Sequence, residues 1–109
     1  MIGGNLKSIN AQELSDMMNN NEDFKLLDVR EDHELEIARI NHDIHIPMGQ
    51  IPKRMSELDK NDKIVVMCHG GVRSARVCSY LTENGYNAIN FTGGINAWSN
   101  EIDQSVPQY

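Results

Sequence analysis

The sequence has little of what marks several classes of protein. Two of its 109 residues are cysteine, too few for a typical secreted fold held together by disulfides. No apolar run approaches the roughly 20 residues that cross a bilayer, and residues 1–7 lack the apolar core of a signal peptide. The net charge is −6, whereas nucleic-acid binders are usually basic. We therefore expect a cytoplasmic protein that binds neither membranes nor nucleic acid.

What the sequence does have is the composition of one folded domain. Apolar residues make up 39% and charged residues 24%, as in globular proteins rather than disordered chains. A chain of 109 residues can bury one core but not two. It shows no internal repeat and no linker. We expect a single domain over residues 1–109, with its motifs between about residues 8 and 102.

Strand-like and helix-like apolar patterns alternate along the chain. Strands are predicted at 24–29, 44–46, 63–67 and around 89–91. Helices are predicted at 11–18, 31–38, 51–58, 74–84 and from 93 onward. The continuous apolar run in 63–67 is typical of a parallel strand covered on both faces. The alternation predicts an α/β fold with a parallel sheet and helices on both faces, and the tail at 105–109 is expected at the surface.

The segment that carries chemistry follows the strongest strand, at residues 68–74, Cys-His-Gly-Gly-Val-Arg-Ser. Ligands of such sheets bind beyond the carboxyl ends of the strands, where Cys68 is expected. The backbone N–H groups at a helix start favour a thiolate, the nucleophilic form of cysteine. Gly70 and Gly71 allow N–H groups to point inward, and Arg73 adds a permanently charged fork. The sequence therefore predicts a nucleophilic sulfur in a small anion-binding cup.

Less specific interpretations stand beside these. Cys68 could be an inert buried cysteine, although the glycines and arginine that follow disfavour this. Cys78 lies on an apolar helix stripe and is expected to serve packing. His69 could be a general base, but a solvent-facing place on the rim is favoured. His42 and His45 have no further ligands clustered with them, so neither a metal site nor a cofactor is expected.

Three short signatures occur in order along the chain. Cys and Arg separated by four residues stand at Cys68 and Arg73, Leu-Asp-Val-Arg at 27–30, and Gly-Gly-Ile-x-Ala-Trp at 93–98. Together they resemble a single-domain rhodanese, a sulfurtransferase, over nearly the whole chain. Residues 38–47 depart from the family's usual Gly-His-Ile-x-Gly-Ala-x-x-Ile-Pro. The resemblance implies a three-layer rhodanese-like α/β fold with a mostly parallel five-stranded sheet and helices on both faces.

The resemblance also implies a mechanism. Cys68 would attack the outer sulfur of a small anionic donor such as thiosulfate, release sulfite, and hold the sulfur as a persulfide. Arg73 would stabilise the sulfonate, and Asp28 and Arg30 would support the site through charge-assisted hydrogen bonds. An acceptor would then take the sulfur: cyanide, a thiol or a protein. The implied substrate-binding residues are His69, Gly70, Gly71, Val72, Arg73 and Ser74.

Loop length and the tail refine this interpretation. Related phosphatases and arsenate reductases carry one more residue between Cys and Arg, because a tetrahedral phosphate needs a wider cup than a sulfur atom. No acid lies in the loop to protonate a leaving alkoxide, so sulfur transfer is favoured. A cysteine phosphatase, an arsenate reductase and a non-catalytic binding module remain the alternatives. The segment 98–109 is similar to the end of rhodanese domains fused to enzymes that activate ubiquitin-like sulfur carriers, which favours a protein acceptor.

Overall fold

A five-stranded sheet forms the centre of the computed structural model, which describes residues 6–109. The strands are β1 (Ser8–Ile9), β2 (Lys25–Asp28), β3 (Ile44–His45), β4 (Lys63–Met67) and β5 (Asn87–Phe91). They lie in the order β1-β5-β4-β2-β3, and every neighbouring pair is parallel. The predicted α/β fold is confirmed. The expectation that no signal peptide is present rests mainly on residues 1–5, which lie outside the described part of the chain.

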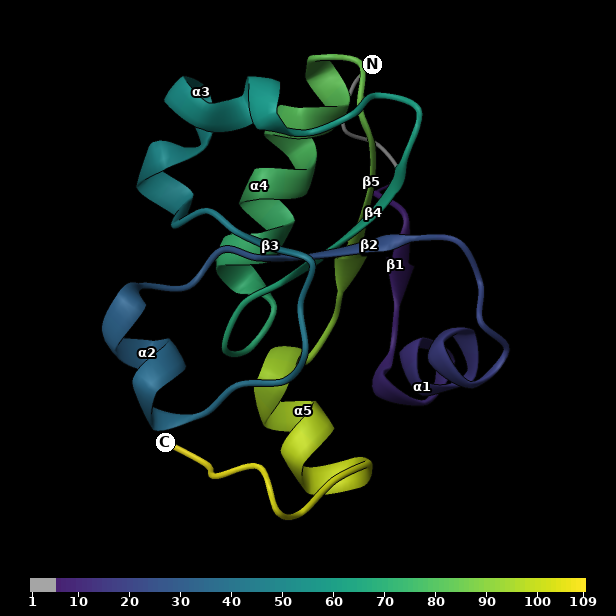
Figure 1. Cartoon of the computed structure of the whole chain (residues 1–109), viewed down its shortest axis with the longest axis vertical. Coiled ribbons are helices and arrows are strands. Elements are labelled where there is room, and N and C mark those ends of the chain that lie inside the picture. Colours follow the sequence, from purple (N-terminus) through teal and green to yellow (C-terminus); the bar gives the residue numbers. More distant parts are fainter. Residues whose placement is uncertain (1–5) are drawn as a thin grey trace.

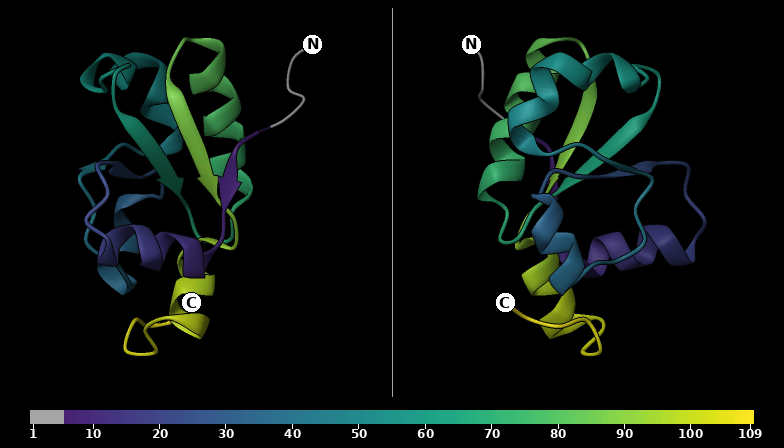
Figure 2. Two further views of the ribbon diagram at one scale, coloured as in Figure 1. Left: turned by 90° about the vertical axis from the view of Figure 1, so that its right-hand side faces the viewer. Right: turned by 60° about the vertical axis from the view of Figure 1, so that its left-hand side comes forward.

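Helices cover both faces of this sheet (Figure 1). They are α1 (Ala11–Asn19), α2 (Asp32–Ile37), α3 (Ile51–Arg54), α4 (Val72–Glu83) and α5 (Gly94–Glu101), with 3-10 turns η1 (Met48–Gln50) and η2 (Met55–Glu57). The helices α1 and α5 pack on one face, and α3 and α4 on the other. Figure 2 shows α2 beside the last residues of the chain, in yellow. Within residues 6–109, no helix is long and apolar enough to cross a bilayer.

The strand β4 divides its side chains between two apolar clusters. Val65 and Met67 pack in the cluster shared with α1 and α5, whereas Ile64, Val66 and Cys68 pack with α4. Successive side chains of a strand point to opposite faces, which explains why an unbroken apolar run was needed here. The prediction of a doubly covered parallel strand at 63–67 is confirmed. Cys68 follows the last residue of β4 and therefore lies just beyond the carboxyl end of the sheet.

The structure adds an edge strand, divides the helix expected at 51–58 into α3 and η2, and moves the start of another helix. The edge strand β1 was not predicted, because two residues paired with the end of β5 leave no periodic signal. The helix expected from Ser74 begins at Val72 instead. Gly71, with φ of +103°, ends the loop and caps this helix. Arg73 and Ser74 therefore belong to the first helical turn rather than to a loop before it.

The segment after α5 folds back onto the domain. The Val106 side chain is buried, and its carbonyl oxygen accepts a hydrogen bond of 2.6 Å from the Ser99 hydroxyl. Its N–H donates to the carbonyl oxygen of Asp103 at 3.1 Å. The prediction that residues 105–109 lie at the surface is confirmed except at Val106, because the other four are exposed. Tyr109 reaches the site described next.

Candidate active site

The Cys68 sulfur lies buried beyond the carboxyl end of β4 and is surrounded by hydrogen-bonding groups. The backbone N–H groups of Gly71 and Ser74 donate to it at 3.0 and 3.4 Å. The thiol in turn donates to the Ser74 hydroxyl at 3.3 Å, and that hydroxyl donates to Asn90 Oδ1 at 2.6 Å. Backbone donors aimed at a sulfur stabilise negative charge on it. Ser74 thus contacts the sulfur through both its backbone N–H and its hydroxyl.

The first turn of α5 holds this loop from behind. The N–H of Ile95 donates to the carbonyl oxygen of Cys68, and that of Asn96 to the carbonyl oxygen of His69, each at 3.0 Å. A Cβ on Gly94 would stand 2.4 Å from both of these oxygens, which is far inside contact distance. The glycine signature at 93–98 thus allows a helix end to approach the loop backbone. With those carbonyls bonded to α5, the loop directs N–H groups toward the sulfur.

The two loop glycines differ in what they require. Gly71 has φ of +103°, and a Cβ there would lie 3.0 Å from the backbone nitrogen of Gly93. Gly70 has no positive φ, and nothing lies within 4 Å of where its Cβ would be. Of the two glycines predicted to let N–H groups point inward, Gly71 takes a backbone conformation that disfavours other residues, and Gly70 does not.

Arg73 is engaged by a carboxylate that the sequence did not single out. Its Nη1 and Nη2 atoms donate to Glu34 Oε1 and Oε2 at 2.7 and 2.8 Å. Glu34 comes from α2 and is buried. This paired contact lowers the pKa of Glu34 to about 2 and raises the pKa of Arg73. The guanidinium was expected to face an oxyanion in the cup; in the structure it joins α4 to α2.

Asp28 and Arg30 form a second, fully buried ion pair behind the loop. The Arg30 Nη2 atom donates to Asp28 Oδ2 at 2.8 Å, and its Nε donates to Oδ1 at 3.0 Å. Its Nη1 also donates to the carbonyl oxygen of Ala38 at 2.9 Å. Burial alone would lower the pKa of Arg30, but hydrogen bonds to Asp28 and Tyr109 outweigh it and raise that pKa. The pair ties the end of β2 to the end of α2.

His69 and Tyr109 lie face to face over these ion pairs. Their ring centroids are 4.1 Å apart, and the ring planes differ by 14°. His69 is half-buried, and its Nε2 atom is closed to solvent and has no hydrogen-bond partner within the described residues. The favoured interpretation of His69 as a solvent-facing rim residue is therefore wrong. The Tyr109 hydroxyl donates to Glu34 Oε2 at 2.8 Å and accepts from Arg30 Nη1 at 2.9 Å.

The predicted loop residues have different contacts in the structure. Gly71 and Ser74 bond the Cys68 sulfur, whereas Arg73 bonds Glu34. Val72 is 70% exposed and makes no hydrogen bond to the sulfur within residues 6–109. Glu34, Asn90 and Tyr109 contact these groups and were missed. Asn90 did leave a signal, because it stands between the apolar Ile89 and Phe91 of β5, and a polar side chain buried there needs a hydrogen-bonding partner. Glu34 is one of several acids in its stretch, and Tyr109 lies in a segment without periodicity.

Cys78 has a contrasting environment. Its thiol is fully buried among apolar side chains of α4 and the sheet. Burial raises the pKa of Cys78 to about 12, with a smaller contribution from the charge of Cys68. Both cysteines are free thiols. The predicted packing position of Cys78 is confirmed.

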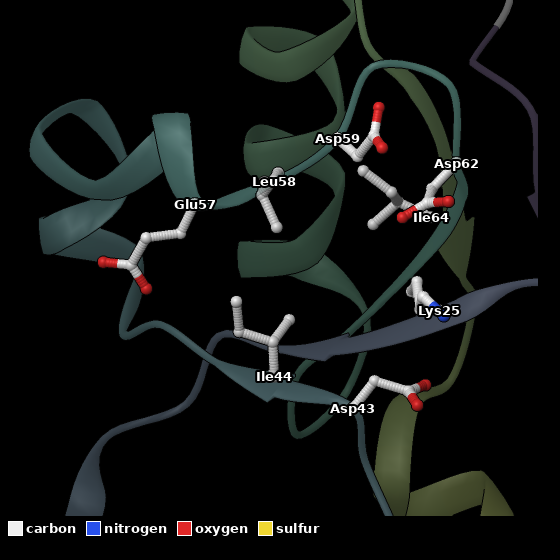
Figure 3. A pocket seen from close by; sticks show the side chains of 8 residues that line it. All are labelled: Lys25, Asp43, Ile44, Glu57, Leu58, Asp59, Asp62 and Ile64. Carbon is white, nitrogen blue, oxygen red and sulfur yellow. The ribbon is translucent and has the colours of Figure 1, made fainter.

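A separate pocket of about 280 Å³ lies at the amino ends of β2 and β4, away from Cys68 (Figure 3). It is lined by Lys25, Asp43, Ile44, Glu57, Leu58, Asp59, Asp62 and Ile64. None of the predicted site residues lines it. Within residues 6–109, no three His, Cys, Asp or Glu side chains gather in a way that could hold a metal ion. The Cys68 loop is therefore the candidate active site.

Comparisons with known proteins found relatives over nearly the whole chain. Residues 10–101 match the family described as "Rhodanese-like domain". The chain is 41% identical to "Putative sulfurtransferase YtwF" of Bacillus subtilis, covering 88% of this chain and 93% of the relative. It is 32% identical to "Putative sulfur carrier protein YrkF" of the same organism, covering 90% of this chain and 54% of the relative.

A solved structure is similar over almost the full length of both chains. The rhodanese-like domain protein of Staphylococcus aureus superimposes with a TM-score of 0.83 at 36% identity, covering 95% of this chain and 99% of that one. The match supports the three-layer arrangement and the five-stranded sheet.

Proposed function

Because this chain belongs to the rhodanese-like domain family, we propose that it is a sulfurtransferase that carries sulfane sulfur as a persulfide on Cys68. Sulfurtransferase activity in general is what the names of its relatives support. One observation carries the finer proposal: the Cys68 sulfur receives N–H groups from Gly71 and Ser74 at the base of the loop. Such donors favour the thiolate and the anionic persulfide over neutral forms.

The proposed first step loads the cysteine. The Cys68 thiolate attacks the outer sulfur of thiosulfate, the S–S bond of thiosulfate breaks, and sulfite leaves with the bonding electrons. An anionic persulfide remains, so total charge is unchanged. In the second step an acceptor thiolate attacks the outer sulfur, takes it as a new persulfide, and returns Cys68 to a thiolate. The N–H groups of Gly71 and Ser74 stabilise the negative sulfur throughout.

Arg73 has a double part in this proposal. Glu34 takes one N–H from each of its terminal nitrogens, and a guanidinium has five N–H donors, so donors remain for the oxygens of a sulfonate. The ion pair also fixes the first turn of α4, from which Ser74 donates to the sulfur. We therefore expect Arg73 to orient both the anionic donor and the loop.

A thiol on a protein is the proposed acceptor in the cell, with cyanide as a test-tube substitute. Three exposed apolar side chains adjoin the Arg73–Glu34 pair: Val72 precedes Arg73, Ile37 follows Glu34 by one turn, and Tyr109 bonds to Glu34. Exposed apolar groups beside a reactive loop suit contact with another protein. The two free thiols fit a reducing, cytoplasmic setting.

Mass spectrometry of the intact protein after incubation with thiosulfate tests the proposal. Wild type and Cys78→Ser should each gain the mass of one sulfur atom, and Cys68→Ser should gain none. Cyanide should then remove the added mass and yield thiocyanate. A sulfur gain that persists without Cys68 contradicts the proposal. No gain with any sulfane donor would favour a non-catalytic binding module, and Cys68-dependent hydrolysis of an aryl phosphate would favour a phosphatase.

A further inference from the structure

Tyr109 covers one face of the side chain that follows the nucleophile. The ring of His69 lies 4.1 Å from that of Tyr109 and is nearly parallel to it. His69 is the residue after Cys68, and its own carbonyl is fixed by the N–H of Asn96. The backbone is thus held by α5 and the ring by Tyr109. Together these contacts leave the imidazole little freedom to change its orientation.

The phenol is itself anchored by two charged groups from different elements. Its hydroxyl donates to Glu34 at 2.8 Å and accepts from Arg30 at 2.9 Å, and both of those residues are buried. Burial raises the pKa of Tyr109, so the phenol stays protonated near neutral pH and keeps the proton that it donates to Glu34. Its place is therefore set by the two ion pairs behind the loop, Asp28–Arg30 and Glu34–Arg73.

The imidazole held in this way carries an unsatisfied polar atom. Nε2 of His69 is closed to solvent and bonds to no group within residues 6–109. A buried polar atom without a partner costs free energy, and native proteins keep few of them. An atom of this kind, one residue from the nucleophile, is suited to contact a bound ligand.

We propose that Tyr109 is a positioning residue that stacks on His69 and fixes its imidazole to contact the anionic sulfur donor. This inference rests on the sulfur-transfer function proposed above. Tyr109 touches neither the donor nor Cys68 in this scheme; it acts through His69. Its loss should therefore weaken donor binding more than it slows the chemical step.

Steady-state kinetics with thiosulfate and cyanide test the first part. Tyr109→Leu should raise the KM for thiosulfate about fivefold, the size expected for one lost aromatic stack, with kcat changed less than about twofold. Tyr109→Phe keeps the ring face but loses the hydroxyl anchors, so its KM should lie between those of wild type and Tyr109→Leu. Tyr80→Leu is the matched control, because Tyr80 is also 37% exposed but lies on α4 outside this contact. An unchanged KM in Tyr109→Leu would overturn the proposal.

A double-mutant cycle with His69→Ala tests whether Tyr109 acts through the imidazole. In the His69→Ala background, Tyr109→Leu should cause no further rise in KM, since the group that it positions is already gone. An equal rise in both backgrounds would show that Tyr109 acts by another route, and the proposal would fail. Thermal unfolding of each variant identifies any general loss of structure.

NMR separates failure of this inference from failure of the proposed function. In the wild type, His69 ring protons should show cross-relaxation with Tyr109 ring protons and an upfield displacement from the stacked ring, which Tyr109→Leu removes and Tyr80→Leu keeps. These signals need no turnover. If thiosulfate loads no sulfur but the signals appear, the positioning contact stands and the proposed reaction fails. If the signals are absent in the wild type, the inference is wrong whatever the activity.

Discussion

The surroundings of Cys68 and Cys78 show what makes one buried thiol a candidate nucleophile and another a packing residue. Both are almost fully buried, both belong to the same apolar cluster, and both are free. The Cys68 sulfur accepts hydrogen bonds from two backbone N–H groups and bonds a hydroxyl. The Cys78 thiol packs among apolar side chains. Burial raises the pKa of Cys78 to about 12.

The difference lies in the backbone rather than in the depth of the site. Gly71 ends the loop in a left-handed conformation, and the loop carbonyls are bonded to α5, so N–H groups face one sulfur. In the middle of α4, the backbone groups around Cys78 bond along the helix and offer nothing to a side chain. Apolar residues around a thiol suppress its ionisation, and free N–H groups favour it.

Alkylation should show the largest contrast between the two thiols. With a pKa of about 12, roughly one Cys78 in ten thousand is a thiolate at pH 8. Iodoacetamide should therefore label Cys68 at least about a thousandfold faster than Cys78 in the folded protein. Peptide mapping after timed labelling measures the ratio, and the denatured protein, in which both thiols are equivalent, is the control. Comparable rates in the folded protein would contradict the contrast.

Gly94→Ala should remove the donor arrangement around Cys68 while leaving that of Cys78 in place. The added Cβ would meet the carbonyl oxygens of Cys68 and His69 at 2.4 Å, so α5 and the loop must separate. We expect a loss of about 3 kcal/mol in the free energy of unfolding, together with at least about tenfold slower sulfur loading. Gly49→Ala, where nothing lies within 4 Å, is the control for both measurements. Sulfur loading at the wild-type rate would argue against the role of α5.

Glu34→Gln should loosen the first turn of α4, on which the donors to Cys68 depend. We expect a loss of about 2 kcal/mol in the free energy of unfolding, because Arg73 keeps a neutral partner. The pKa of Glu34 is about 2 in the folded chain, below its ordinary value of 4.5. Its stabilisation is thus full above about pH 4.5 and is lost as the pH falls toward 2.

Denaturant unfolding between pH 7 and 2 measures this dependence. The difference in stability between wild type and Glu34→Gln should shrink steadily below pH 4.5. Glu57→Gln is the control, because the Arg54–Glu57 pair has the same chemistry but is exposed and should change neither stability nor its pH dependence. A difference that stays constant across the range would mean that the Glu34 charge is not the cause.

Cys78→Ala should have the smallest effect of these substitutions, and it should lower stability without changing sulfur loading. Removing the sulfur atom leaves a small cavity, and we expect a loss of about 1 kcal/mol in the free energy of unfolding. Sulfur loading of Cys68 should stay within about twofold of wild type. Thermal unfolding and the mass assay check the two expectations. A large fall in loading would show that Cys78 takes part in the chemistry and that the two environments are not independent.

The sequence predicted the parts of the site that are local in the chain. Residues 68–74 contain the nucleophile, the glycine of the turn and the start of α4, so their order alone indicates a cup. The strand before them is continuously apolar, and the predicted helix at 11–18 begins with a capping box of Asn10 and Glu13. Each of these features is set by neighbours within a few residues, which is what patterns report.

Contacts between distant segments could not be predicted in the same way. Arg73 could pair with any of 16 acids, and only the fold brings Glu34 to it. Tyr109 lies in a tail without periodicity, so its stacking on His69 left no trace in the pattern. The strand β1 is formed by two residues whose pairing partner is β5. In each case several contact partners fit the sequence equally well, and tertiary packing selects one of them.

The hydrogen bonds from α5 to the carbonyl oxygens of Cys68 and His69 also set the stage of protein synthesis at which the reactive loop can form. The ribosome makes the nucleophile first, then α4 and β5, and only afterwards the helix that orients the loop. Chains emerge at about 5–20 residues per second, so for a second or more the loop exists without the helix that bonds its carbonyls. A nascent chain thus carries an ordinary thiol, and the reactive site arises only once the domain has closed around it.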